Sequence, residues 1–104
     1  MRKVEWRPRA HLDRESIAIY LGVERQNPQA ALDAIAGIDA TVRNICEFPE
    51  IGRAFAFEGL AHSDYRCAVS GRYRIFYRFT PERVTIYRVL HQHQNIDAYS
   101  LIGF

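Results

Sequence analysis

The stretch that decides the fold is Tyr73-Arg74-Ile75-Phe76-Tyr77-Arg78-Phe79. Aromatic and β-branched residues alternate with arginine in it, which is the two-residue period of a half-buried strand. Similar runs flank it at 64–70 and 83–91, and the three runs are separated by the tight turns Ser70-Gly71-Arg72 and Thr80-Pro81-Glu82. Two short turns between such runs predict consecutive antiparallel hairpins.

Two helical patterns precede these strands. Residues 9–24 place Leu12, Ser16, Ile19, Tyr20 and Val23 on one helical face, with Ile17 and Leu21 beside them. Residues 28–47 carry a narrow stripe at 4-3-4-3 spacing, namely Ala31, Ile35, Ile38, Val42 and Ile45. Asn27-Pro28 suits the cap and first turn of the second helix, and Pro8 suits the start of the first. We therefore predict an antiparallel helical hairpin whose two apolar stripes are buried.

The order of these elements defines the fold class. Residues 2–7 alternate apolar and charged residues and predict a short opening strand, while 49–63 reads as a loop that wraps the domain. The order is then β-α-α-β-β-β. It predicts a single α+β domain over 1–104, with a helical hairpin packed on a small curled antiparallel sheet.

The strand period assigns side chains to the two faces of this sheet. We expect the odd-numbered residues to meet the helices, namely Tyr65, Cys67, Val69, Tyr73, Ile75, Tyr77 and Phe79. The outer face then carries Arg66, Ala68, Ser70, Arg74, Phe76 and Arg78, joined by Arg88. The last strand is apolar on both sides, so we expect its outer side to be covered by a partner or by the tail residues Tyr99, Leu101, Ile102 and Phe104.

Composition limits the possible classes of protein. The chain has 104 residues, of which 48% are hydrophobic and 25% charged, as in globular domains. No apolar run approaches the roughly 20 residues of a membrane span, and the start lacks a signal-peptide core. Two cysteines, Cys46 and Cys67, do not form a disulfide framework. These observations predict a cytoplasmic protein without a membrane partner.

Positive charge is concentrated in the second half of the chain. Residues 1–59 carry 8 Lys/Arg and 9 Asp/Glu, for a net charge of −1, whereas 60–104 carry 6 Arg and 3 acids, for +3. Arginine pairs bidentately with carboxylates. An excess of +3 is low for nucleic-acid binding and fits an acidic protein partner at least as well.

Three motifs carry a family resemblance: Phe48-Pro49-Glu50-Ile51-Gly52-Arg53, Tyr73-Arg74-Ile75-Phe76-Tyr77-Arg78 and Arg88-Val89-Leu90-His91-Gln92. In this order they resemble toxins of the ParE/RelE superfamily from type II toxin–antitoxin systems. The resemblance implies a cognate antitoxin that wraps the sheet and helices, and a toxin–antitoxin pair that reaches operator DNA only through the antitoxin. The resemblance also implies one of two activities. ParE-like members act on DNA gyrase, and RelE-like members cleave mRNA on ribosomes. The first and third motifs resemble those of ParE-like members more closely.

The leading hypothesis is therefore a gyrase-directed toxin that acts by protein contact, without catalytic residues, cofactor or metal. Its predicted surface for the antitoxin or target comprises Arg66, Arg74, Phe76, Arg78, Arg88, His91, Gln92 and His93. An exposed Phe76 among cations would mark a contact site. The alternative is that these arginines form a merely solvated strand face.

Two further hypotheses remain open. A ribonuclease needs a base, an acid and cations at the phosphate, and the candidates are Arg66, Arg74, His91, His93 and Tyr99. The lysines typical of RelE-like enzymes are missing, since Lys3 is the only lysine. A degenerate toxin that only binds its antitoxin is the third hypothesis. His91 and His93 have the spacing of metal ligands, but no carboxylate or cysteine pattern completes a site.

Overall fold

The computed structural model describes residues 1–56, 59–60 and 62–94. Its elements are β1 (Lys3–Trp6), α1 (Pro8–Ile19), the π-helical turn η1 (Tyr20–Glu24), α2 (Pro28–Glu47), β2 (Arg53–Phe55), β3 (Tyr65–Ser70), β4 (Tyr73–Phe79) and β5 (Arg83–His91). The predicted fold, a helical hairpin packed on a sheet in the order β-α-α-β-β-β, is confirmed. The structure adds β2, which lies in the segment predicted to be a loop.

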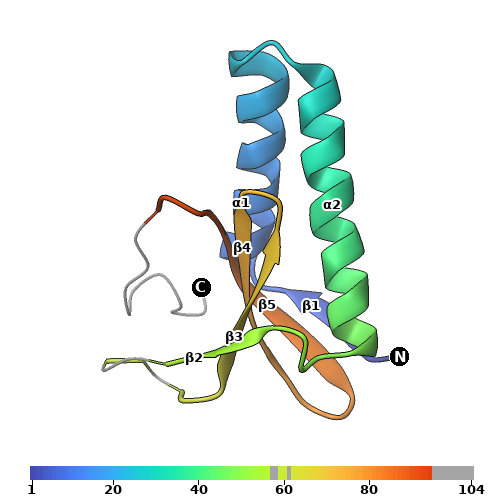
Figure 1. Ribbon diagram of the computed structural model, residues 1–104, viewed down its shortest axis with the longest axis vertical. Coiled ribbons are helices and arrows are strands. Elements are labelled where there is room, and N and C mark those ends of the chain that lie inside the picture. The colour runs from blue at the N-terminus through green and yellow to red at the C-terminus, as the bar shows by residue number, and fades with distance from the viewer. Residues whose placement is uncertain (57–58, 61, 95–104) are drawn as a thin grey trace.

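The helices begin where the sequence predicts. Pro8 opens α1, and the side-chain oxygen of Asn27 accepts a hydrogen bond from the backbone N–H of Ala30 at 3.1 Å, which caps α2. At its other end α1 widens into η1, where the Arg25 N–H donates to the carbonyl of Tyr20, five residues back. The part of the hairpin that contains η1 extends beyond the sheet (Figure 1).

The sheet has the strand order β1-β5-β4-β3-β2 and is mixed, not purely antiparallel. The neighbours β2–β3, β3–β4 and β4–β5 are antiparallel, whereas β1 pairs with β5 in parallel. β1 covers only residues 83–86 of β5. Farther along that edge, the Val89 N–H donates to the carboxylate of Asp13 in α1 at 2.9 Å, so a helix side chain satisfies the strand where β1 has ended.

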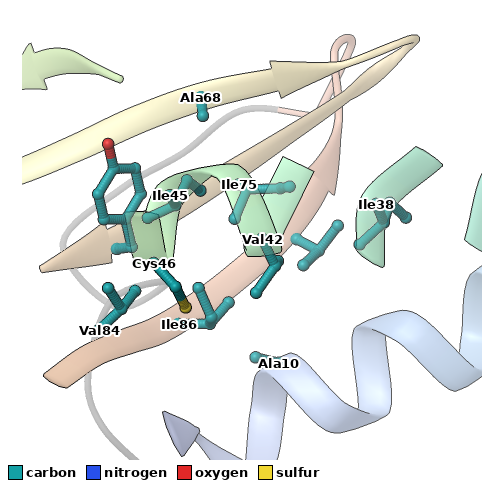
Figure 2. Packing of buried hydrophobic residues seen from close by; sticks show 11 residues of the cluster. Ala10, Ile38, Val42, Ile45, Cys46, Ala68, Ile75, Val84 and Ile86 are labelled. Atoms are coloured by element: carbon teal, nitrogen blue, oxygen red, sulfur yellow. The ribbon is translucent and has the colours of Figure 1, made fainter. Parts of the chain in front are cut away.

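The main core lies between α2 and the sheet. Ile38, Val42, Ile45 and Cys46 of α2 pack against buried side chains of the strands, namely Ala68, Ile75, Tyr77, Val84, Ile86 and Val89 (Figure 2). Burial of the α2 stripe is confirmed for Ile38, Val42 and Ile45, while Ile35 is half-buried. From α1, only Ala10 is fully buried among the described residues.

A second, smaller core lies on the other face of the sheet. Tyr65, Phe76 and Leu90 are buried there, with Phe55, Leu60, Cys67 and Tyr87 packed against them. Phe55 and Leu60 thus supply part of the cover that the last strand requires. The tail residues predicted to cover it, Tyr99, Leu101, Ile102 and Phe104, lie outside the described residues.

The sequence assigned the wrong inward-facing side to two elements, β3 and the first helix. In β3, Ala68 pairs with Ile75 and faces the helices, while Cys67 pairs with Phe76 on the outer face. The reason is the two-residue turn, which pairs Ser70 with Tyr73. Directly paired residues share a face, so the even-numbered residues of β3 join the odd-numbered residues of β4.

In α1 and η1, three apolar residues predicted to be buried are exposed instead, by 60% for Leu12, 56% for Ile19 and 69% for Val23. The inward side of α1 carries Ala10 and Ile17 together with ion pairs. Arg14 forms two hydrogen bonds with Asp39 of α2, at 2.6 and 3.0 Å, and Asp13 pairs with β5. Periodicity grouped Leu12, Ile19 and Val23 on one helical face but did not reveal that the side carrying Asp13 and Arg14 is the one that packs against the protein.

Candidate functional site

The arginines predicted to form one cationic surface do not lie on one surface. Arg78 donates two hydrogen bonds to Asp64, at 2.8 and 3.2 Å, and a third to the Tyr87 hydroxyl at 3.3 Å. Its hydrogen bond to Asp64 raises the pKa of Arg78, and the same contact lowers the pKa of the Asp64 carboxyl. Arg78 is therefore already paired within the chain.

Arg88 is paired more deeply. Its guanidinium donates to both carboxylate oxygens of Asp13, at 2.7 and 2.9 Å, and the two side chains are only 11% and 13% exposed. This bidentate pair ties β5 to α1. Removing either partner would leave a buried charge, so the pair has a structural role regardless of any docking partner.

Arg66 lies on the helix side because of the reversed face of β3. It donates to the carbonyl of Gly52 at 2.7 Å, and its guanidinium lies 5.9 Å from the centre of the Phe79 ring. The same loop is held by Tyr77, whose hydroxyl donates to the Pro49 carbonyl at 2.6 Å and accepts from the Gly52 N–H at 2.9 Å. A Cβ at Gly52 would overlap this hydroxyl. The Phe48–Gly52 motif is thus a rigid corner after α2.

Arg74 and Phe76 both lie on the outer face. Phe76 is fully buried in the second core, so the prediction that it is exposed is wrong. Arg74 lies over the Phe76 ring, 5.5 Å from its centre, and donates to the carbonyl of Gln94 at 2.6 Å. Arg74 therefore connects β4 to the turn that follows β5.

That turn, residues 91–94, is called here the histidine turn. The Gln92 N–H donates to the carbonyl of Arg72 at 2.7 Å, and the His91 N–H donates to the side-chain oxygen of Gln94, also at 2.7 Å. The His93 N–H donates to Nδ1 of His91 at 3.2 Å. The ring centres of His91 and His93 lie 5.1 Å apart, and the rings of Tyr73 and His91 meet in a T-shaped contact at 5.6 Å.

A pocket of about 550 Å³, called here the histidine pocket, separates this turn from the first helix. Its lining comes from α1, η1, β4, β5 and the turn: Asp13, Ser16, Ile17, Tyr20, Tyr73, Val89, His91, His93 and Gln94. A second hollow of about 670 Å³ shares Tyr20, Tyr73 and His91 with it and extends to Arg25 and Arg72. Together they form a continuous depression beside the helical hairpin.

An exposed apolar strip borders this depression. Leu12, Ile19, Tyr20 and Val23, called here the α1 stripe, recur at helical spacing on the outer side of α1 and η1, and Tyr20 also lines the pocket. Its upper end lies on the part of the hairpin that extends past the sheet (Figure 1). Contiguous exposed apolar side chains rimmed by polar groups mark interaction sites. The sequence identified these residues but predicted them to be core.

The structure brings together only some of the candidate catalytic residues. Arg66 pairs with Tyr77 and His91 with Tyr73. Because strands rise about 3.3 Å per residue, these positions are separated by about 13 Å along β4. Arg74, His91 and His93 meet at the histidine turn, while Tyr99 lies outside the described residues.

In the part of the chain that the structure describes, little supports metal binding, a reactive cysteine or a membrane span. No group of three or more His, Cys, Asp or Glu residues is arranged to hold a metal ion there. Burial raises the pKa of the Cys46 and Cys67 thiols, which disfavours the reactive thiolate. Among the described helices, none combines the length and the apolar character needed to cross a bilayer.

Comparison with solved structures shows which known chains share this fold. The chain is similar to one in the structure of the chromosomal ParDE toxin–antitoxin system from P. aeruginosa, with a TM-score of 0.66 and 20% identity over 88% of this chain and 96% of that one. It is also similar to a chain in the RelBE2 toxin–antitoxin complex from Mycobacterium tuberculosis, with a TM-score of 0.61 and 20% identity over 86% and 96%. The comparison with curated protein sequences gave no match.

The family itself follows from the sequence. The model of the ParE toxin of the type II toxin–antitoxin system parDE matches residues 4–96, nearly the whole chain. The chain therefore belongs to the ParE toxin family, and it is the toxin component of a type II toxin–antitoxin system.

Proposed function

We propose that this toxin inhibits DNA gyrase in the cytoplasm and is held inactive by a cognate antitoxin that packs on the α1 stripe. The observation that carries the proposal is the exposure of that stripe. Leu12, Ile19 and Val23 are all more than half exposed, although they follow the spacing of a buried helical face. A surface of this kind fits an amphipathic segment of a partner.

The solved structures that share the fold support an antitoxin as this partner, because both are structures of toxin–antitoxin pairs. We further propose that the antitoxin carries the operator-binding part, so that the toxin reaches DNA only through it. Since Arg78 and Arg88 are already paired within the chain, the docking surface centres on the α1 stripe, Arg74 and the histidine turn.

Gyrase as the target is supported by membership of the ParE family. The dispersal of the candidate catalytic residues adds to this support. Arg66 is engaged by the Gly52 carbonyl and lies far along β4 from His91, so the two do not flank a common phosphate. A toxin that works by contact alone requires no such cluster.

One observation favours the ribonuclease as a second candidate. The rings of His91 and His93 are 5.1 Å apart, and Arg74 reaches the same turn. Two histidines and a cation are the elements of acid–base cleavage of RNA.

Two assays separate the candidates. Purified toxin is tested for inhibition of gyrase supercoiling, and in parallel for mRNA cleavage in a purified translation system. We expect inhibition of supercoiling and no cleavage, both for the wild type and for the His91→Ala and His93→Ala variants. Cleavage on ribosomes that is lost in His91→Ala, with supercoiling unaffected, would replace gyrase by the ribosome. Binding of the antitoxin without either activity would indicate a degenerate toxin.

A further inference from the structure

The histidine pocket has walls of two kinds. Ile17 and Val89 supply aliphatic surface, and Tyr20 and Tyr73 supply aromatic rings. At the turn, the two imidazoles of His91 and His93 lie side by side. Such a site fits an apolar side chain that stands next to a polar or charged one.

The charges around the pocket favour an acidic occupant. Among the described residues of its lining, Asp13 is the only carboxylate, and hydrogen bonds from Arg88 and from the Val89 N–H already engage both of its oxygens. Arg72 and Arg25 line the adjoining hollow, where Asp33 accepts a hydrogen bond from the Gln29 amide. Arg74 reaches the turn itself through Gln94. Among the described residues at the two hollows, the cations Arg25, Arg72 and Arg74 therefore stand beside two carboxylates, Asp13 and Asp33, and Asp13 is already bonded to Arg88.

The two histidines are not equivalent. Nδ1 of His91 accepts the backbone N–H of His93, and this hydrogen bond requires that Nδ1 carries no proton. A proton on Nδ1 would place two donors against each other and break this hydrogen bond. His93 has an exposed side chain, and its ring is not fixed by this hydrogen bond. His93 is therefore the member of the pair whose ring can take up a proton without breaking this hydrogen bond.

We propose that the histidine pocket binds an apolar anchor and an adjacent carboxylate of the antitoxin, and that His93 takes up a proton as the complex forms. The inference rests on the proposed antitoxin docking and adds the chemistry of the contacted segment and a dependence on pH. His91 donates to the carboxylate from Nε2, and protonated His93 pairs with it. Histidine changes charge between pH 5 and 8, so the linkage falls in the physiological range.

Calorimetry of the wild-type toxin with the protein encoded by the adjoining reading frame tests this proposal. Titrations at pH 7 in two buffers of different ionisation enthalpy report the number of protons exchanged. We expect net proton uptake, and an affinity about fivefold higher at pH 6 than at pH 8, which is a typical coupling between linked sites.

Variants assign the proton to a residue. In His93→Gln, proton uptake and pH dependence should both shrink, whereas the matched control His62→Gln, another exposed histidine, should behave like the wild type. Comparing the two removes any contribution from the antitoxin's own histidines. Thermal unfolding of each free variant verifies that it is folded.

Each outcome has a distinct meaning. If the adjoining protein does not bind at any pH, both the proposed antitoxin docking and this inference fail. Tight binding with no proton uptake, or with uptake unchanged in His93→Gln, overturns only the inference. Loss of ribosomal mRNA cleavage in His93→Gln, without an effect on antitoxin affinity, would assign His93 to catalysis and overturn it as well.

Discussion

A single hydroxyl group, that of Tyr77, holds the corner between α2 and β2. It is buried and bonded to both Pro49 and Gly52. In Tyr77→Phe these two backbone groups lose their partner, so we expect the free energy of unfolding to fall by about 1–3 kcal/mol. Denaturant unfolding measures this. Tyr73→Phe on the same strand is the matched control, and an equal loss there would show that the hydrogen bonds of Tyr77 are not the cause.

The Asp64–Arg78 pair predicts a dependence of stability on pH. Hydrogen bonding to Arg78 lowers the pKa of Asp64 in the folded state. Its contribution to stability is therefore present above the unfolded pKa, about 3.9, and is lost as pH falls through the lower folded value. In Asp64→Asn, stability should fall less steeply below about pH 4 than in the wild type. Parallel curves for the two proteins, measured by urea unfolding from pH 5 to 2, would contradict this account.

Residue types alone did not reveal which arginines are available to a partner. Arg66, Arg74, Arg78 and Arg88 look equivalent in the sequence, yet Arg88 pairs with Asp13, 75 positions away, and Arg78 with Asp64. Ion pairs between residues so distant in the chain leave no local pattern. The histidine turn was visible as a polar segment, but the hydrogen bond that fixes His91 depends on the fold.

At the scale of elements, α1 and α2 both carry an apolar stripe, but the stripe of α2 is buried and that of α1 is exposed. Ile38 of α2 is fully buried, while Ile19 of α1 is 56% exposed. Ile38→Ala should cost about 2–5 kcal/mol of unfolding free energy through the cavity it leaves. Ile19→Ala should cost less than about 1 kcal/mol but weaken binding of the antitoxin. Similar destabilisation in both variants would place Ile19 in the core.

The strands show what local pattern can and cannot predict. The periods of β4 and β5 gave their bounds within one residue, and the α2 cap was found at Asn27. The faces of β3 were inverted because they depend on how the turn pairs Ser70 with Tyr73, which alternation within one strand does not specify. Likewise, α1 directs Asp13 and Arg14 toward the protein, beside Ala10 and Ile17, because these two charged residues find partners on other elements.

At the scale of the whole molecule, the fold followed from element order, whereas the candidate site required the assembled structure. The histidine pocket combines α1, η1, β4, β5 and the turn, and the α1 stripe is exposed because it lies on the outer side of α1 and η1. Neither the lining of the pocket nor the exposure of the stripe can be deduced from the sequence of one element.

The distribution of charge around this site gives a prediction for the complex. Arg74 reaches the histidine turn, whereas Arg53 is exposed on β2. If acidic antitoxin residues dock at the turn, Arg74→Glu should weaken the complex at least about tenfold, because like charges at an interface repel. Calorimetry at low salt measures the affinity. An equal effect in Arg53→Glu would show a general effect of net charge instead.

The most direct test of the account measures how much antitoxin restores gyrase supercoiling. We predict that wild-type toxin inhibits supercoiling and that equimolar antitoxin restores it. The Ile19→Asp toxin should inhibit equally when alone but require about tenfold more antitoxin for the same recovery, because a charge on the α1 stripe weakens docking. Recovery at the same antitoxin concentration for both toxins, or no inhibition by the wild type, would contradict the account.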